Sequence, residues 1–129
     1  MTRKETSRIL AMPVVWEVHI TLLQKKFRQW AEQKAGQLQR LHITTEPVNH
    51  GHVNEQYIPD PSTGFVHESG CAMGQVTVWE SGQMEYEVIN IETEELILWK
   101  YIERIEDETP DFDRLLQVYI QVLQTGVNP

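Results

Sequence analysis

Three consecutive stretches decide the fold: QVTVWE at residues 75–80, MEYEVINI at 84–91 and ELILWKYI at 95–102. The first and third are rich in β-branched and aromatic residues, which favour strands. In the second, Glu85 and Glu87 alternate with apolar residues, as in a strand with one solvated face. The third is apolar on both faces over most of its length. These patterns predict three strands.

Turn residues occupy the gaps between the three stretches. Ser81-Gly82 is a two-residue turn signal, and the polar residues 92–94 supply a second turn. The sequence therefore predicts a three-stranded antiparallel meander. Any fourth strand would come from residues 43–73, which contain three prolines, three glycines and few periodic apolar positions. We expect a long irregular segment there.

That irregular segment has two places where short strands are expected, at residues 56–58 and 64–68. Helical patterns flank the whole region. Between residues 14 and 41, large apolar residues recur at three- and four-residue steps, and Gly36 marks a place where this helix ends or bends. A second helix is expected near the C-terminus, with Thr109 as its N-cap and Pro110 as its first residue.

The last apolar pattern stops at Gly126, a residue that commonly ends helices. Two helices on one face of a small antiparallel sheet is the simplest way to bury all the apolar surfaces. The sequence thus predicts an α+β protein with a three-stranded meander, at most extended by a fourth strand, packed against a long N-terminal helix and a C-terminal helix. A single domain over residues 1–129 is expected.

Composition limits the function classes. The chain has 129 residues, 40% of them hydrophobic, a formal net charge of -8 and one cysteine. No apolar run is long enough to span a bilayer, so no membrane contact is expected. A single cysteine suits a reducing compartment, and the first residues lack the apolar stretch of a secretion signal. We therefore expect a cytoplasmic protein, and an acidic one that does not bind nucleic acid directly.

Charge is distributed unevenly along the sequence. Residues 1–41 hold eight bases and three acids, whereas residues 42–129 hold three bases and 16 acids, so the two parts carry +5 and -13. In one interpretation a basic helix packs beside an acidic sheet and the two fields cancel. In another, the acidic surface attracts a basic partner. The two interpretations are compatible.

Four residues suggest a metal site. His50 and His52 flank a glycine, and His67 and Cys71 follow in the same irregular segment. Imidazole nitrogen and thiolate sulfur are ligands that zinc prefers. However, the spacing matches no known zinc motif, and loop histidines exposed to water are the simpler interpretation. A small metal-binding protein or metal-dependent enzyme using these four residues remains the alternative hypothesis, and we expect no cofactor.

Catalysis has little support in the sequence. Glu80, Glu85 and Glu87 surround one tight turn, but a pair of catalytic carboxylates also needs a substrate cleft, for which this domain has little room. Cys71 follows His67 by four residues, yet nothing in the spacing positions that histidine as its base. A solvated acidic strand face and a small buried cysteine are the simpler interpretations.

A binding surface is the remaining candidate. Trp79 precedes the acidic turn, and aromatic anchors framed by charge are typical of protein interfaces. A row of carboxylates on a strand can also imitate the phosphates of a nucleic acid, or pair with lysine and arginine side chains in a basic active site. The alternative for Trp79 is a core position packed on the first helix, and we favour that position.

The run GQVTVWESG at residues 74–82, with MEYEVI, IETE and LW after it, resembles the TriTu-type immunity proteins of bacterial polymorphic toxin and contact-dependent growth inhibition systems. The Phe27-Arg28-Gln29-Trp30 run is similar to a pattern in the leading helix of that family. The resemblance is strong over residues 74–102. The chain departs from the family at Glu94, where members often have glycine, and residues 43–73 do not align.

The resemblance implies a non-enzymatic inhibitor that binds the C-terminal toxin domain of its own system, as a monomer in a one-to-one complex, and blocks its basic active site. For this family the toxins are RNases that act on transfer RNA, some aided by elongation factor Tu. We expect the toxin to meet an acidic set of residues: Glu80, Glu85, Glu87, Glu92, Glu94 and Asp107. A structural subunit that assembles through residues 96–102 or the basic first helix is a third hypothesis.

Overall fold

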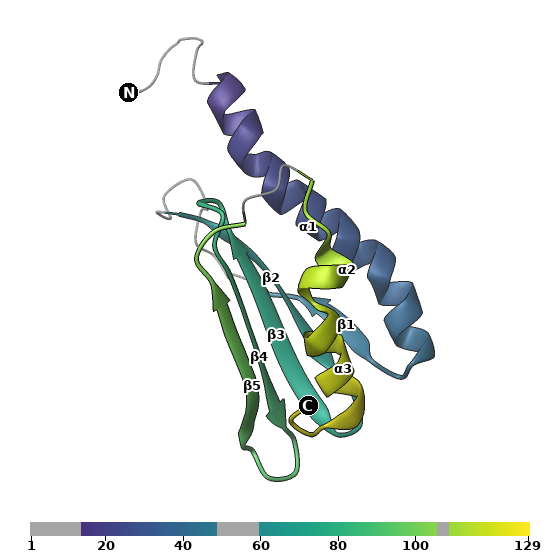
Figure 1. Ribbon diagram of the computed structural model, residues 1–129. Coiled ribbons are helices and arrows are strands. Elements are labelled where there is room, and N and C mark those ends of the chain that lie inside the picture. The colour runs from purple at the N-terminus through teal and green to yellow at the C-terminus, as the bar shows by residue number, and fades with distance from the viewer. Residues whose placement is uncertain (1–13, 49–59, 106–108) are drawn as a thin grey trace.

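The computed structural model of the chain describes residues 14–48, 60–105 and 109–129. Figure 1 shows the elements in chain order: α1 (Val14–Arg40), β1 (Thr44–Pro47), β2 (Ser62–Glu68), β3 (Ala72–Trp79), β4 (Met84–Asn90), β5 (Leu96–Ile102), α2 (Phe112–Leu115) and α3 (Gln117–Thr125). The architecture is α+β, with one long helix before an antiparallel sheet and two short helices after it, in agreement with the class predicted from the sequence.

The sheet has five strands in the order β1-β2-β3-β4-β5, and every neighbouring pair is antiparallel. The predicted meander corresponds to β3, β4 and β5, but the expected total of three or four strands is too small. Both additional strands come from residues 43–73, so the expectation of an irregular segment is wrong where they run. The strand expected at 64–68 forms most of β2, while the one expected at 56–58 lies outside the described residues.

α1 ends one residue before the predicted limit and continues through Gly36 without ending there. Its C-terminus turns at His42, whose φ of 62° is in the left-handed region. The backbone N–H of Ile43 donates to the carbonyl oxygen of Leu38 over 2.9 Å, which directs the chain into β1. Within the described part of the chain, no helix combines the length and apolar character needed to cross a membrane.

The N-terminus of α2 differs from the prediction. The cap is Asp111, whose Oδ1 accepts a hydrogen bond from the backbone N–H of Arg114 over 3.2 Å, so Thr109 is not the cap and Pro110 is not the first helical residue. A carboxylate is a charged acceptor placed at the positive end of the helix, which favours it over a threonine hydroxyl. Gly126 ends α3 with a φ of 71°, as predicted.

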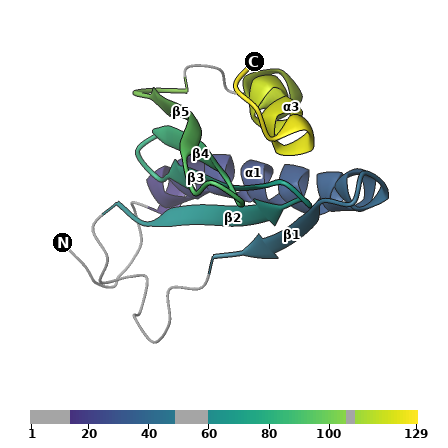
Figure 2. The same cartoon turned by 90° about the horizontal axis from the view of Figure 1, so that it is seen from below.

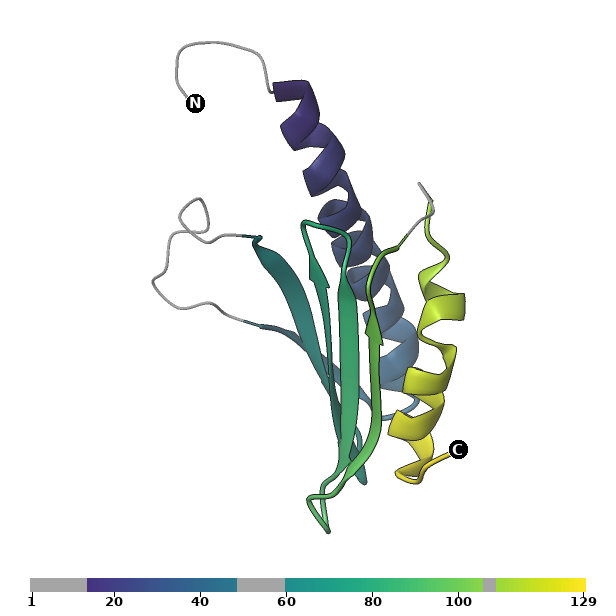
Figure 3. The same cartoon turned by 60° about the vertical axis from the view of Figure 1, so that its left-hand side comes forward.

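All three helices lie against one face of the sheet (Figure 3). The view from below shows α3 on the same side of the strands as α1 (Figure 2). An aromatic cluster connects the layers: the ring centroid of Phe27 on α1 lies 5.6 Å from that of Phe65 on β2 and 5.4 Å from that of Phe112 on α2. The core is therefore a single layer of side chains between the sheet and the helices.

Side chains alternate along the strands between this core and the opposite face, which we call the open face. The core-facing side includes Phe65, Val76 and Tyr86, all buried. Strand register and alternation assign the following residues to the open face: Thr44, Glu46, Val66, Glu68, Met73, Gln75, Thr77, Trp79, Glu85, Glu87, Ile89, Trp99 and Tyr101. The expected alternation of Glu85 and Glu87 with buried apolar residues is confirmed.

Gly74 allows α3 to pack closely on β3. A Cβ at this position would lie 2.8 Å from Cε1 and 2.9 Å from the hydroxyl oxygen of Tyr119, whose side chain is fully buried. We expect Gly74→Ala to lower the free energy of unfolding by about 2 kcal/mol, because neither the strand backbone nor the enclosed ring has room to move. Urea unfolding followed by circular dichroism measures this change.

Gly36 provides the matched control for that substitution. A Cβ on Gly36 meets nothing within 4 Å, and the residue lies inside α1. Gly36→Ala should therefore raise the free energy of unfolding by up to about 1 kcal/mol, since alanine favours helix over glycine. Equal stability of Gly74→Ala and the wild-type protein would contradict the packing role of Gly74.

Candidate functional site

Charge is separated between the two sides of the molecule. On the open face, carboxylates come from β1, β2 and β4: Glu46, Glu68, Glu85 and Glu87. Among the strands described, the one lysine or arginine is Lys100, which pairs with Tyr86 and so belongs to the core-facing side. The bases of the N-terminal third lie mainly on α1, against the other side of the sheet. A basic helix thus packs beside an acidic sheet, as in the first interpretation, while attraction of a basic partner stays a prediction.

Glu85 and Glu87 lie beside two exposed aromatic side chains on β5. In the β4–β5 register, Glu85 is opposite Tyr101 and Glu87 is opposite Trp99. The indole Nε1–H of Trp99 donates to Oε2 of Glu85 over 2.8 Å. Trp99 is 54% exposed and Tyr101 is 42% exposed. Two of the predicted acidic residues are thus brought together with two aromatic rings that the sequence hypothesis did not include.

Glu92 and Glu94 lie in the turn between β4 and β5, both exposed. The side-chain Oδ1 of Asn90 holds this turn by accepting hydrogen bonds from the backbone N–H groups of Glu92 and Thr93, each over 2.9 Å. Glu94 has a φ of 63°, in the left-handed region. Glycine adopts this conformation without strain, so a glycine would suit this position better than glutamate.

Glu80 lies at the other end of β4, in the turn between β3 and β4. Strand β3 ends at Trp79 and β4 begins at Met84, so this connection is longer than the predicted two-residue turn. Ser81 anchors it through two 2.8 Å hydrogen bonds from its backbone N–H and its hydroxyl to the carboxylate of Asp60. The structure therefore separates Glu80 from Glu92 and Glu94 by the length of a strand. Asp107 lies outside the described residues.

Trp79 does not pack on the first helix as expected. It follows the buried Val78 on β3, so its side chain belongs to the open face, where it is half-buried. The prediction followed the large apolar surface of tryptophan, whereas alternation with the buried Val76 and Val78 places Trp79 on the other side of the strand. The open face thus carries three aromatic residues among its carboxylates.

The residues of the metal hypothesis do not converge where they are described. His67 is 1% exposed and its Nδ1 lies 2.7 Å from the hydroxyl of Tyr119 in a hydrogen bond. The thiol of Cys71 is directed to the carbonyl oxygens of Leu123 and Gln124 at 3.8 and 3.7 Å. Residues 14–48, 60–105 and 109–129 contain no group of three or more potential ligands suited to a metal ion.

The other two histidines of that hypothesis, His50 and His52, lie outside the described residues. His67 is held in the core instead. Burial lowers the pKa of His67 to about 4 and raises the pKa of Tyr119 well above its ordinary value. Both side chains are therefore neutral at physiological pH, and their hydrogen bond joins β2 to α3 inside the core.

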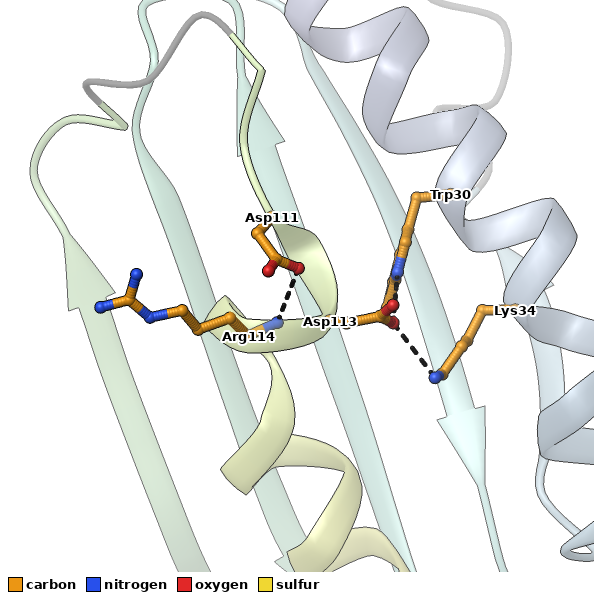
Figure 4. A network of polar contacts seen from close by, with 5 residues as sticks. All are labelled: Trp30, Lys34, Asp111, Asp113 and Arg114. Carbon is orange, nitrogen blue, oxygen red and sulfur yellow. Dashed lines mark hydrogen bonds and ion pairs between the residues drawn. The ribbon is translucent and has the colours of Figure 1, made fainter.

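A polar network joins α1 to α2 on the helical side (Figure 4). Oδ1 of Asp113 accepts from the indole Nε1–H of Trp30 over 2.9 Å and lies 3.1 Å from Nζ of Lys34. The hydrogen bonds from Trp30 and Lys34 hold the pKa of Asp113 below its ordinary value. A cavity of about 350 Å³ lies beside this network. The polar groups here bind one another and fix the helices in place.

A comparison with known protein families covers most of the chain. A family model described as immunity protein TriTu matches residues 25–122. The chain belongs to the TriTu immunity protein family. The matched region extends from α1 to α3 and contains the whole described sheet, including the open face. No curated protein and no solved structure matches the chain.

Membership of the TriTu family places the chain in a family of immunity proteins rather than in a catalytic family. The resemblance over residues 74–102 is therefore confirmed, and it extends over a much longer region than that segment. Sequence reasoning missed Trp99 and Tyr101 as surface residues because β5 is apolar on both faces, a pattern typical of a buried strand. Their signal was the alternation within β5, which puts Trp99 and Tyr101 on one side of the strand and, through the pairing with Glu85 and Glu87, on the solvated face.

Proposed function

We propose that this TriTu family member binds and neutralises a cognate toxin domain that is an RNase acting on transfer RNA, and that it does so by covering the toxin's basic active site. The observation that supports this mode of action is the open face, which carries four carboxylates and, in its described strands, no lysine or arginine. An RNase active site is basic because it holds phosphates, so the two surfaces are complementary.

The acidic charge of the open face would also help an inhibitor to bind its toxin quickly. Long-range attraction between an acidic face and a basic cleft accelerates association, because it orients the encounter before contact. A toxin that enters or is made in the cytoplasm must be captured before it reaches its RNA. We therefore place this protein in the cytoplasm, as a monomer that forms a one-to-one complex with the toxin domain. Elongation factor Tu is proposed as a further component on the toxin's side.

The proposal is tested with the toxin C-terminal domain that we expect the gene upstream of this protein's gene to encode. The purified domain should cleave transfer RNA, and titration with this protein should stop cleavage at a molar ratio of one. Because salt screens exposed charges, the association rate constant should fall at least about tenfold between roughly 0.05 and 0.5 M salt. Stopped-flow mixing and RNA gels measure the two effects.

Two outcomes of this experiment would count against the proposal. Cleavage that continues in a saturated complex would show that the active site is not covered. An association rate that does not depend on salt would show that the acidic face does not guide binding. Repeating the titration with elongation factor Tu present shows whether the factor belongs to the inhibited complex.

A further inference from the structure

The β4–β5 part of the open face combines exposed aromatic surface with a fixed carboxylate. Trp99 and Tyr101 project from the same side of β5 and are 54% and 42% exposed, although large aromatic residues usually gain stability from burial. The hydrogen bond from Trp99 to Glu85 ties the indole to the neighbouring strand. The indole is thus held in place in the free protein, which lowers the conformational entropy that the Trp99 side chain loses when a partner binds.

The chemistry of these groups selects a cationic side chain. Directly opposed residues on antiparallel strands have Cβ atoms about 5 Å apart, so Glu85 lies beside Tyr101, and its hydrogen bond reaches Trp99 diagonally across the two strands. A guanidinium group stacks on an aromatic face and pairs with a carboxylate at the same time, whereas an ammonium group lacks the planar surface for stacking. Oε2 of Glu85 accepts from the indole, and a carboxylate has further lone pairs for a guanidinium.

The charge of the whole face excludes other occupants. Nucleic acid and anionic lipid headgroups would be repelled by the carboxylates of β1, β2 and β4. A second copy of this chain would set glutamates against glutamates, which disfavours a symmetric pair. A basic protein surface that presents arginine is the partner that fits both the rings and the charges.

We propose that Trp99, Tyr101 and Glu85 form the receiving site for an arginine side chain of the toxin domain, with Glu87 beside it. This inference rests on the proposed function, since the toxin domain is the basic partner. It goes further because it places the exposed rings of Trp99 and Tyr101 at the centre of the interface, in addition to the carboxylates. Hot spots of protein interfaces are enriched in tryptophan, tyrosine and arginine, and they pair with one another across the interface.

The experiment compares dissociation constants for the toxin domain encoded upstream, measured by isothermal titration calorimetry. We expect Trp99→Ala to weaken binding by about 30-fold or more, as for an interface hot spot. Trp99→Phe keeps a ring for stacking and loses the indole hydrogen bond, so the loss should be smaller. Lys100→Gln is the matched control, because Lys100 is the next residue on β5 and faces the other side of the sheet. Its affinity should remain within about threefold of wild type.

A second arm tests the arginine itself. Exposed arginines of the toxin domain are replaced one at a time by lysine, and each variant is measured against wild type and Trp99→Ala. For one toxin arginine, the loss of affinity in the combination with Trp99→Ala should be smaller than the sum of the two separate losses. That result identifies the arginine as the residue that stacks on Trp99. Thermal unfolding of each immunity variant shows whether the fold is intact, and Trp99→Phe keeps the test valid if Trp99→Ala is unstable.

The outcomes separate this inference from the proposed function. If the wild-type protein fails to bind or protect, the proposed function itself is overturned. If the wild-type protein binds and Trp99→Ala binds equally well, the aromatic anchor alone is overturned. Losses that add for every toxin arginine would also overturn it. A concentration-dependent dimer in sedimentation that Trp99→Ala abolishes would assign the face to a second copy of the chain.

Discussion

The variant Glu85→Lys/Glu87→Lys should bind the toxin domain about a thousandfold more weakly than the wild-type protein at low salt, because two attractive contacts become repulsive at the centre of the interface. Both side chains lie on the open face of β4, and Glu85 also accepts the hydrogen bond from Trp99. The loss should appear in both the association and the dissociation rate constants. Surface plasmon resonance at low and high salt measures these constants.

A matched control for this variant lies on the helical side. Glu32 is an exposed residue of α1, so Glu32→Lys makes the same change in charge away from the open face. Glu32→Lys should change affinity by less than about threefold, whereas each single reversal on β4 should cost more than about tenfold. If all three single reversals weaken binding equally, net charge rather than the open face governs recognition. An unchanged affinity of the double variant at low salt would refute the acidic binding surface.

The second large effect is a loss of stability in acid caused by His67. Its pKa is lowered by burial to about 4, from about 6.5 in the unfolded chain. Between these values the unfolded chain binds the extra proton and the folded protein does not. The stability is therefore complete above pH 6.5 and decreases as the pH falls. The decrease attributable to His67 should reach about 3 kcal/mol near pH 4.

Substitution of His67 isolates this contribution. In His67→Gln the side chain keeps a polar group near Tyr119 but no longer titrates, so the free energy of unfolding should fall less steeply between pH 6.5 and 4. Urea unfolding at pH 7, 5.5 and 4 measures how the free energy of unfolding of each protein changes with pH. The two proteins have the same carboxylates, so the difference between their slopes is attributable to residue 67. Identical slopes for wild type and His67→Gln would disprove the assignment.

Periodicity predicted the elements whose apolar residues repeat regularly. α1 and the strands β3, β4 and β5 follow patterns that extend over seven or more residues. β1 has only four residues, one of them Pro47, so neither length nor alternation marks it. β2 buries Thr63 and His67, which are polar, and includes Gly64. Local sequence therefore contains no signal for β1 and marks β2 only over residues 64–68, because the full strands depend on pairing with their neighbours.

The same reasoning explains what could be predicted of the binding surface. Alternation on β4 was enough to assign Glu85 and Glu87 to a solvated face. Which side of β5 faces away from the helices depends on the register of the sheet: Glu85 and Glu87 pair with Tyr101 and Trp99, so the two aromatic residues share the open face. Only this register makes Trp99 and Tyr101 surface residues. Glu80 and Glu94 were grouped in the hypothesis because they are near in sequence, yet they lie at opposite ends of β4.

The edge position of β5 has a consequence for the protein before it meets a partner. An edge strand with exposed apolar side chains presents free backbone N–H and C=O groups, onto which strands of other molecules can add and grow into aggregates. Lys100 lies in the middle of β5, and a lysine within an edge strand disfavours pairing with a strand of another molecule. This charge therefore opposes aggregation through the edge, while the open face of the sheet stays available for recognition.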